Sequence, residues 1–145
     1  MHTFHTLAGD KIEIEEKYRL HTIQIHFAVL IALRDIGYQD TTINDFYIWD
    51  KTIIFVSART LQLVYGEDTK TVHIASSCFM VLQHKFALLF GFVHLLERNT
   101  DAEWIVRNPA GEKLSFFLGK QKLSGSVDLE EQGVKQDSVV TVVGE

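Results

Sequence analysis

The chain runs through one order of predicted elements twice, and this repeat constrains the fold more than any other feature of the sequence. Residues 1–16 alternate apolar and polar side chains on either side of Gly9, which predicts a β-hairpin whose turn uses the positive φ that glycine tolerates. An apolar helix is predicted over residues 20–36, with Gly37 at its end. The strand "KTIIFVSA", residues 51–58, completes this first set.

The second half of the chain repeats the order. A hairpin with its turn at Gly66 is predicted over residues 59–76, and a helix over residues 79–96. A further strand and the final strand "SVVTVVGE", residues 138–145, come after the helix. A join near residue 58 gives two predicted domains, 1–58 and 59–145. Each mixes strands with one helix, so the predicted fold class is α+β.

The segments before the two last strands can be aligned with each other. Residues 42–56 and 128–142 share a small polar start, an acidic residue at the fourth position and an apolar residue, Ile48 or Val134, at the seventh. A short helical turn that docks one apolar side chain and then leads into the last strand would give this pattern. Such a turn is therefore predicted in both domains.

The two ends of the chain resemble a known family. The stretch "LSFFLGKQKLSGSVDLEEQGVKQDSVVTVVGE", residues 114–145, is similar to the second half of ubiquitin and its relatives, where a strand leads through a "GKQL" turn to the last strand. The opening "MHTFHTLAGDKIEIE" is similar to the first hairpin of that family. The resemblance implies two tandem ubiquitin-like β-grasp domains. The first would be truncated, because residues 37–42 leave no room for the middle strands, and the second would carry an insertion over residues 97–112.

Tandem ubiquitin-like chains with a terminal glycine resemble the interferon-stimulated two-domain modifier of vertebrates and its bacterial counterparts in antiphage operons. The resemblance implies a modifier that is conjugated to target proteins, phage structural proteins among the candidates. A JAB-type processing and deconjugating protease would remove Glu145. An E1-like enzyme would then activate the carboxylate of Gly144, and an E2-like enzyme would transfer it to an amine as an isopeptide. Glycine suits this role because a Cβ would clash in a narrow enzyme channel.

Lys120 lies in the stretch "LGKQKL", where the turn lysine of ubiquitin accepts a further ubiquitin. The resemblance therefore implies an acceptor lysine for chain formation. An exposed turn lysine that only aids solubility is the simpler explanation, because almost any surface lysine fits that description.

Two other functions fit the same residues. One is a non-conjugated tandem ubiquitin-like adaptor or self-assembling scaffold, and the other is a protein like the sulfur carriers, which also use a glycine-ended β-grasp domain. Enzymatic activity is not expected, because the sequence has no nucleophile elbow, phosphate-binding loop or dinucleotide fingerprint. No cofactor or metal is expected, because the seven histidines form no H-x₃-H pair and Cys78 is the single cysteine.

Both predicted helices are apolar on more than one face, and one sheet covers only one of those faces. The uncovered side chains predict a homo-oligomer or an extensive interface between the domains. The expected self-association surface consists of Val81, Leu88, Phe92, Leu95, Ile25 and Val29. The alternative is that the insertion around Trp104 folds over the second helix.

Charge and composition narrow the expected partners and compartment. The formal net charge of −5 argues against nucleic acid, because phosphate binding requires a basic surface. Polar residues such as Gln83 and Lys85 interrupt the apolar run over residues 79–96, so no membrane span is expected. The single cysteine, and an N-terminus without a basic region followed by an apolar run, favour the cytoplasm.

Overall fold

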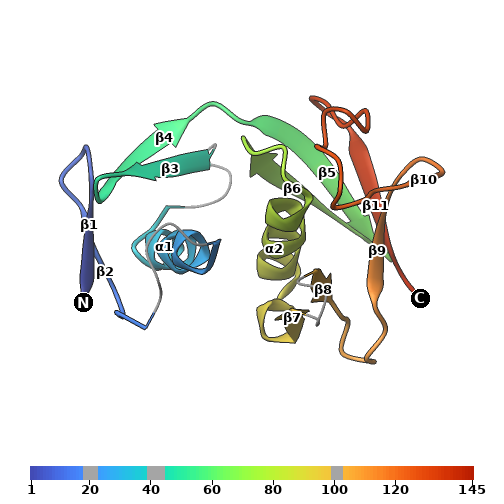
Figure 1. Cartoon of the computed structure of the whole chain (residues 1–145), viewed down its shortest axis with the longest axis horizontal. Helices are drawn as coiled ribbons and strands as arrows, with labels where there is room; N and C mark the ends of the chain where they lie inside the picture. Colours follow the sequence, from blue (N-terminus) through green and yellow to red (C-terminus); the bar gives the residue numbers. More distant parts are fainter. Residues whose placement is uncertain (18–22, 39–44, 99–102) are drawn as a thin grey trace. The chain divides into compact units, whose positions relative to one another are not determined.

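The computed structural model describes residues 1–17, 23–38, 45–98 and 103–145. In those ranges the fold mixes two α-helices with several sheets (Figure 1). The chain splits into two compact units, Met1–Ala58 and Arg59–Glu145, and each of them holds one α-helix and one mixed sheet. No helix in the described ranges is long and apolar enough to cross a membrane.

The first unit is a four-stranded sheet with one helix in the described ranges. Its elements are β1 (His2–Thr6), β2 (Lys11–Ile14), α1 (Ile23–Asp35), β3 (Asp45–Trp49) and β4 (Thr52–Val56). The sheet order is β2-β1-β4-β3, in which β4 runs parallel to β1 and the other neighbours are antiparallel. The predicted first hairpin is confirmed, and Gly9 in its turn has a φ of 98°.

β3 is a strand where the sequence predicted a helical turn. It pairs antiparallel with β4 along its whole length, so that Tyr47 lies opposite Ile54. Asp50 and Lys51 connect the two strands, and both have positive φ, 45° and 63°, which matches the twist of a tight hairpin. The helical-turn prediction is therefore wrong in the first unit, because this tight turn lets every residue of β3 join the ladder. One of the strands that the predicted truncation removed is present as β3.

The end of α1 agrees with the prediction. Gly37 has a φ of 109°, and the N–H of Tyr38 donates to the carbonyl oxygen of Leu33 at 3.0 Å, as at a glycine-terminated helix end. The predicted start of this helix, residues 20–22, lies outside the described residues.

Two residues of α1 correct the predicted self-association surface. Ile25 and Val29 are buried, with exposed fractions of 3% and 0%, and Leu33 on the same line of the helix is also fully buried. This line belongs to the core, together with residues such as Phe4 and Ile53. Neither Ile25 nor Val29 is therefore available at a surface.

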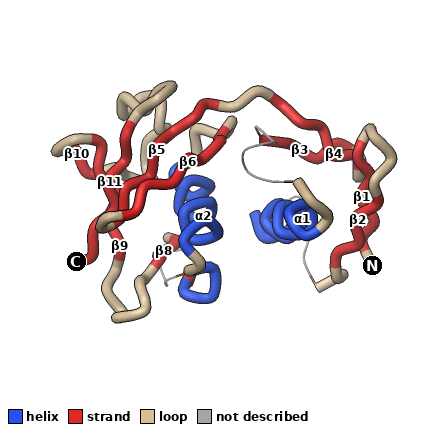
Figure 2. Tube along the Cα trace, turned by 180° about the vertical axis from the view of Figure 1, so that it is seen from behind, coloured by secondary structure: helices blue, strands red, loops and turns tan. Residues whose placement is uncertain are grey.

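The second unit is built on a five-stranded sheet. Its elements are β5 (Arg59–Tyr65), β6 (Asp68–Ile74), α2 (Phe79–Phe90), the 3₁₀ turn η1 (Val93–Leu95), β7 (Leu96–Arg98), β8 (Trp104–Val106), β9 (Leu114–Leu118), β10 (Gln121–Lys122) and β11 (Val139–Gly144). The order is β10-β9-β11-β5-β6, with β11 parallel to β5 and antiparallel to β9. Figure 2 shows α2 beside this sheet, and the buried cluster joins Leu82 and Phe86 of the helix to Leu61 and Leu63 of β5.

Helix α2 ends six residues before its predicted limit, at Phe90. Gly91 takes the left-handed conformation, with φ of 79° and ψ of 22°. The N–H of Phe92 donates to the carbonyl oxygen of Ala87 at 2.7 Å and closes the helix. The apolar residues beyond Gly91 therefore continue as a 3₁₀ turn and a strand.

The insertion folds over α2. β7 and β8 form an antiparallel hairpin, and Gln83 Nε2 donates to the carbonyl oxygen of Trp104 at 2.9 Å. The rings of His84 and Trp104 meet edge to face with their centroids 4.5 Å apart. Gln83, His84 and Lys85 are all buried, and Lys85 Nζ donates to the carbonyl oxygen of His73. The alternative in which the insertion covers the helix is thus confirmed.

The other four residues of the predicted self-association surface, Val81, Leu88, Phe92 and Leu95, are half-buried. Val81 and Phe92 pack against the core of the second unit. Of the six predicted residues, Ile25 and Val29 are buried, whereas these four keep part of their surface accessible, and their role in self-association stays a prediction. Homo-oligomerisation is a separate question and stays a prediction.

The predicted docking turn occurs in the second unit. The N–H of Val134 donates to the carbonyl oxygen of Leu129 at 3.0 Å, and both side chains are buried. Gln132 stabilises the loop over residues 124–127, because its Nε2 donates to the carbonyl oxygens of Ser124 and Val127. The segment therefore docks two apolar side chains, and one glutamine orders the loop that precedes it.

Candidate functional site

Gly144 is the last residue of β11 and lies within the sheet. It pairs with Leu114 of β9, and Val143 pairs with Ser115. The N–H of Glu145 donates to the carbonyl oxygen of Lys113 at 2.9 Å, so the ladder continues one residue further. The sequence predicts Thr141 to Val143 as the last ordered strand residues, with Gly144 at or beyond the edge of the sheet; β11 instead extends one residue further and ends at Gly144. The backbone bond from Glu145 is the reason.

The side chain of Glu145 is bound as well. Its Oε1 accepts hydrogen bonds from Ser115 Oγ at 2.6 Å and from Lys122 Nζ at 2.9 Å. The bonds from the Ser115 hydroxyl and the Lys122 ammonium hold the pKa of the Glu145 side chain below its ordinary value of 4.5, because both favour the charged carboxylate. Ser115 is 3% exposed, whereas 53% of the Lys122 side chain is exposed. One partner is therefore fixed by burial, and the other lies at the surface.

The fold does not require a glycine at position 144. Seven of the nine glycines have positive φ, which accounts for them, and Gly144 is not one of the seven. A Cβ at Gly144 would lie 2.9 Å from Oε2 of Glu112, which is the far end of a flexible side chain. That carboxylate also accepts a hydrogen bond from Asn108 Nδ2, so an alanine at position 144 would require the Glu112 side chain to shift against this bond. The backbone conformation therefore does not explain the glycine, and the steric contact that a Cβ would make is with one flexible side chain.

Lys120 is exposed in the turn between β9 and β10, where Gly119 has a φ of 62°. This position leaves the side chain accessible to a conjugating enzyme. It suits an ordinary solubilising lysine equally well. Lys120 therefore remains a candidate acceptor, and its geometry does not distinguish it from an ordinary surface lysine.

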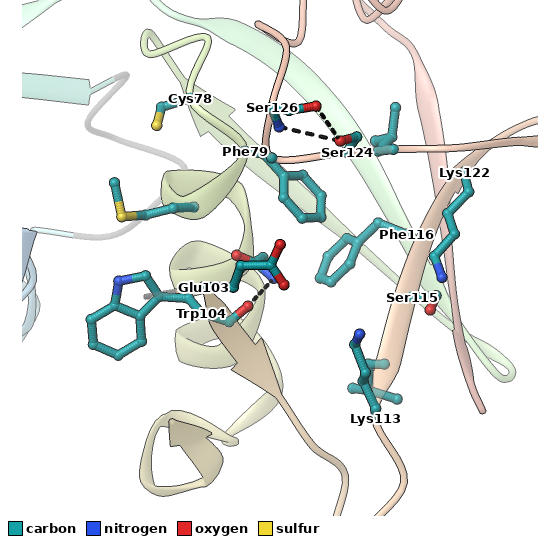
Figure 3. A pocket seen from close by; sticks show the side chains of 15 residues that line it. Cys78, Phe79, Glu103, Trp104, Lys113, Ser115, Phe116, Lys122, Ser124 and Ser126 are labelled. Carbon is teal, nitrogen blue, oxygen red and sulfur yellow. Dashed lines mark hydrogen bonds between the residues drawn. The ribbon is translucent and has the colours of Figure 1, made fainter. Parts of the chain in front are cut away.

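A cavity of about 580 Å³ opens beside the Glu145 site (Figure 3). It lies between the start of α2, the start of β8, β9 and the loop after β10, and Lys113, Ser115 and Lys122 line one side. Phe79 and Phe116 meet edge to face in its wall, with ring centroids 5.5 Å apart. Its volume lies within the range of small-molecule binding sites, and its lining mixes polar with aromatic side chains.

Cys78 also lines this cavity. It is half-buried and precedes the first residue of α2. The sequence favours a core position for Cys78 over a nucleophile, and its half-buried side chain meets that prediction only in part. Sequence reasoning did not find the cavity, because its walls come from segments that only the tertiary fold brings together.

In the described ranges, no three His, Cys, Asp or Glu side chains lie close enough to hold a metal ion. The residues around Gly144 can bind a carboxylate and present a strand end. No protein-family model matches the chain, and no curated protein matches it in sequence.

Proposed function

We propose that the protein is a ubiquitin-like modifier of two tandem β-grasp domains and that Gly144 is the residue through which it is joined to target proteins. The sheet order supports the β-grasp assignment. In both units the last strand runs parallel to the first strand of the hairpin and lies inside the sheet, between that strand and an antiparallel neighbour. A helix follows each hairpin in the chain.

The observation that carries the proposal is the glycine at the end of β11. β11 is otherwise a run of valines and a threonine, and neither φ nor a rigid neighbour requires glycine at its end. A glycine without a conformational role fits a chemical one. An acyl donor that must pass through a narrow enzyme channel is such a role, because a Cβ would meet the channel walls.

The chemistry would begin with hydrolysis of the peptide bond after Gly144 by a JAB-type protease. An E1-like enzyme would adenylate the new carboxylate and pass the acyl group to a cysteine thiolate. An E2-like enzyme would then deliver it to a lysine amine of a target, with loss of the thiol and formation of an isopeptide bond. Bacterial antiphage defence in the cytoplasm is the setting that the family resemblance suggests.

Two alanine variants test the role of Gly144. Gly144→Ala is expected to slow thioester formation on the order of 10²-fold, as misplacement by about 1 Å does at other reacting centres. Gly125→Ala is the matched control, because Gly125 also lacks positive φ and its added Cβ would meet only Phe79 at 3.7 Å. Intact mass spectrometry after incubation with ATP and the E1-like, E2-like and protease partners would measure the adducts. Conjugation through Glu145, or equal rates for the two variants, would refute the proposal.

A second candidate, a non-conjugated adaptor, is favoured by a different observation. Trp49 and Tyr47 on β3 are 72% and 49% exposed, and exposed tyrosine and tryptophan are typical of protein-binding surfaces. Gly144 and Glu145 are also held in the sheet rather than in a tail. If no adduct forms while a control modifier reacts with the same enzymes, the adaptor becomes the better assignment.

A further inference from the structure

Glu145 attaches the end of β11 to β9 and β10 through three hydrogen bonds. Its backbone N–H donates to the Lys113 carbonyl oxygen, and its Oε1 accepts from Ser115 Oγ and Lys122 Nζ. We call these three contacts the Glu145 clasp. These contacts extend the attachment of the strand one residue past the Gly144–Leu114 pair.

We propose that Ser115 and Lys122 form a carboxylate-binding site, that the Glu145 side chain is its intramolecular ligand, and that hydrolysis after Gly144 empties the site and frees the strand end. The inference rests on the proposed function in one respect, the cleavage after Gly144. In the uncleaved chain the clasp would keep Gly144 in the sheet and out of an enzyme channel.

The hydrolysis changes the backbone contact from attraction to repulsion. Water adds to the carbonyl carbon of Gly144, the bond from that carbon to the Glu145 nitrogen breaks, and the nitrogen leaves with a proton. A carboxylate oxygen of Gly144 then stands where the Glu145 N–H stood, opposite the Lys113 carbonyl oxygen. Two acceptors cannot share a hydrogen bond, so the pair that closed the ladder now opposes it.

The hydrolysis also removes the ligand of the side-chain site. The Ser115 hydroxyl is buried, and without Glu145 it loses the acceptor that it has in the intact chain. Lys122 loses the same carboxylate, and the nearby charge of Lys113, which also favours the ionised form of Glu145, remains. The emptied site carries positive charge and a hydroxyl donor, which is the chemistry that binds a carboxylate.

Hydrogen exchange and backbone relaxation by NMR can test the clasp without any enzyme. The full chain is compared with a chain that ends at Gly144. The Val143 amide in the shorter chain is expected to exchange about 10-fold faster or more, because the strand end opens locally. The heteronuclear NOE of Gly144 should fall to the range of a flexible terminus. Unchanged exchange and NOE, as would follow if the new Gly144 carboxylate moved into the site of Ser115 and Lys122, would overturn the release.

Single substitutions test the side-chain contacts of Glu145 separately from its backbone hydrogen bond. Glu145→Gln and Lys122→Met keep the backbone bond and remove the charge pair, so each should accelerate Val143 exchange by about 2- to 5-fold, less than the shorter chain does. Glu131→Gln, at an exposed position of the docking turn, is the matched control and should leave the rate unchanged. Equal Val143 exchange rates in all variants would show that the contacts of Ser115 and Lys122 with Glu145 do not stabilise the strand end.

The two proposals can fail separately. If the shorter chain releases its end but no enzyme accepts it, the modifier function fails and the clasp stands. If the shorter chain is conjugated while Gly144 stays as protected as in the full chain, the clasp fails and the modifier function stands.

Discussion

Both units place their last strand parallel to their first strand, but the segments that lead into the last strand differ greatly in length. In the first, Asp50 and Lys51 alone join β3 to β4. In the second, residues 119–138 connect β9 to β11 and include β10 and the docking turn. The parallel pair of first and last strands is common to both. The comparison shows that this pair and the helix define the unit, and that the connection is free to vary.

The long connection is also where the second unit acquires its candidate site. Lys120 and Lys122 lie on it, and Gln132 orders its middle part through bonds to Ser124 and Val127. The insertion adds Trp104 to the wall of the cavity. The described part of the first unit, residues 1–17, 23–38 and 45–58, has neither segment, and a two-residue turn joins its last two strands. Chemistry at the end of the last strand is therefore expected only in the second unit.

The largest expected effect tests whether the two units are independent. Phe86 is fully buried and its ring contacts those of Tyr65, Phe90 and Phe116. Phe86→Ala should lower the free energy of unfolding of the second unit by about 3–5 kcal/mol. The indole NMR signals of Trp104 and Trp49 report on the second and first units separately during urea titration. A shift of both transitions together would show that the units unfold as one.

Removing the anchor of the docking turn should have the next largest effect. Leu129 is fully buried and has no counterpart in the first unit, whose connection is only a turn. Leu129→Ala should cost about 2–4 kcal/mol in the second unit and loosen the loop fastened by Gln132. Urea denaturation followed by circular dichroism would measure the cost. Val127→Ala, at a more exposed position of the same loop, is the control and should cost far less.

The tight turn of the first unit offers a stabilising change. Lys51 has a φ of 63°, a conformation that glycine adopts without the steric cost of a Cβ. Lys51→Gly should therefore raise the stability of the first unit by about 0.5–1 kcal/mol and leave the second unchanged. A loss of stability in thermal unfolding would mean that the Lys51 side chain contributes more than its backbone strain costs.

The smallest expected effect is the pH dependence of the Glu145 clasp. The pKa of Glu145 is lowered in the folded chain, first by the Ser115 hydrogen bond and then by Lys122, so the clasp is fully formed above the ordinary value of 4.5. It should be lost as the pH falls through the lowered pKa. Gly144 relaxation, measured by NMR from pH 7 down to about 3, should show the strand end loosening at the acid end. Glu145→Gln should show no such transition, and a transition of equal size in that variant would contradict the assignment.

Local patterns predicted the parts of this fold that depend on neighbours in sequence. The turns at Gly9 and Gly66, the helix end at Gly37 and the docking turn at Leu129 and Val134 are examples. β3 was misassigned because a five-residue segment with a polar start is too short for its alternation of apolar and polar side chains to indicate a strand. Pairing with β4 decides its conformation. Helix α2 was predicted too long because apolar residues continue past Gly91. That glycine was the residue in the sequence that indicated the end of the helix.

The candidate site also has one part that the sequence could predict and one part that depends on the tertiary fold. Gly144 could be named from the sequence because it ends the stretch that resembles the last strand of ubiquitin-like proteins. Its placement within the sheet, and the partners of Glu145, could not be predicted. Ser115 and Lys122 are distant from Glu145 in the chain, and the register of β9 against β11 and β10 determines that they meet.

The parallel pairing of β5 with β11 has a consequence for synthesis of the chain. Gln62 pairs with Val139, about 77 positions later (139 − 62), whereas His5 pairs with Thr52, about 47 positions later (52 − 5). At roughly 5–20 residues per second, the ribosome needs about 4–15 s between β5 and the strand that completes its sheet. The first unit can close its sheet well before the second. During that interval the nascent hairpin β5–β6 and helix α2 present apolar side chains to chaperones and to neighbouring chains, which makes the second half of the molecule the part most exposed to misfolding.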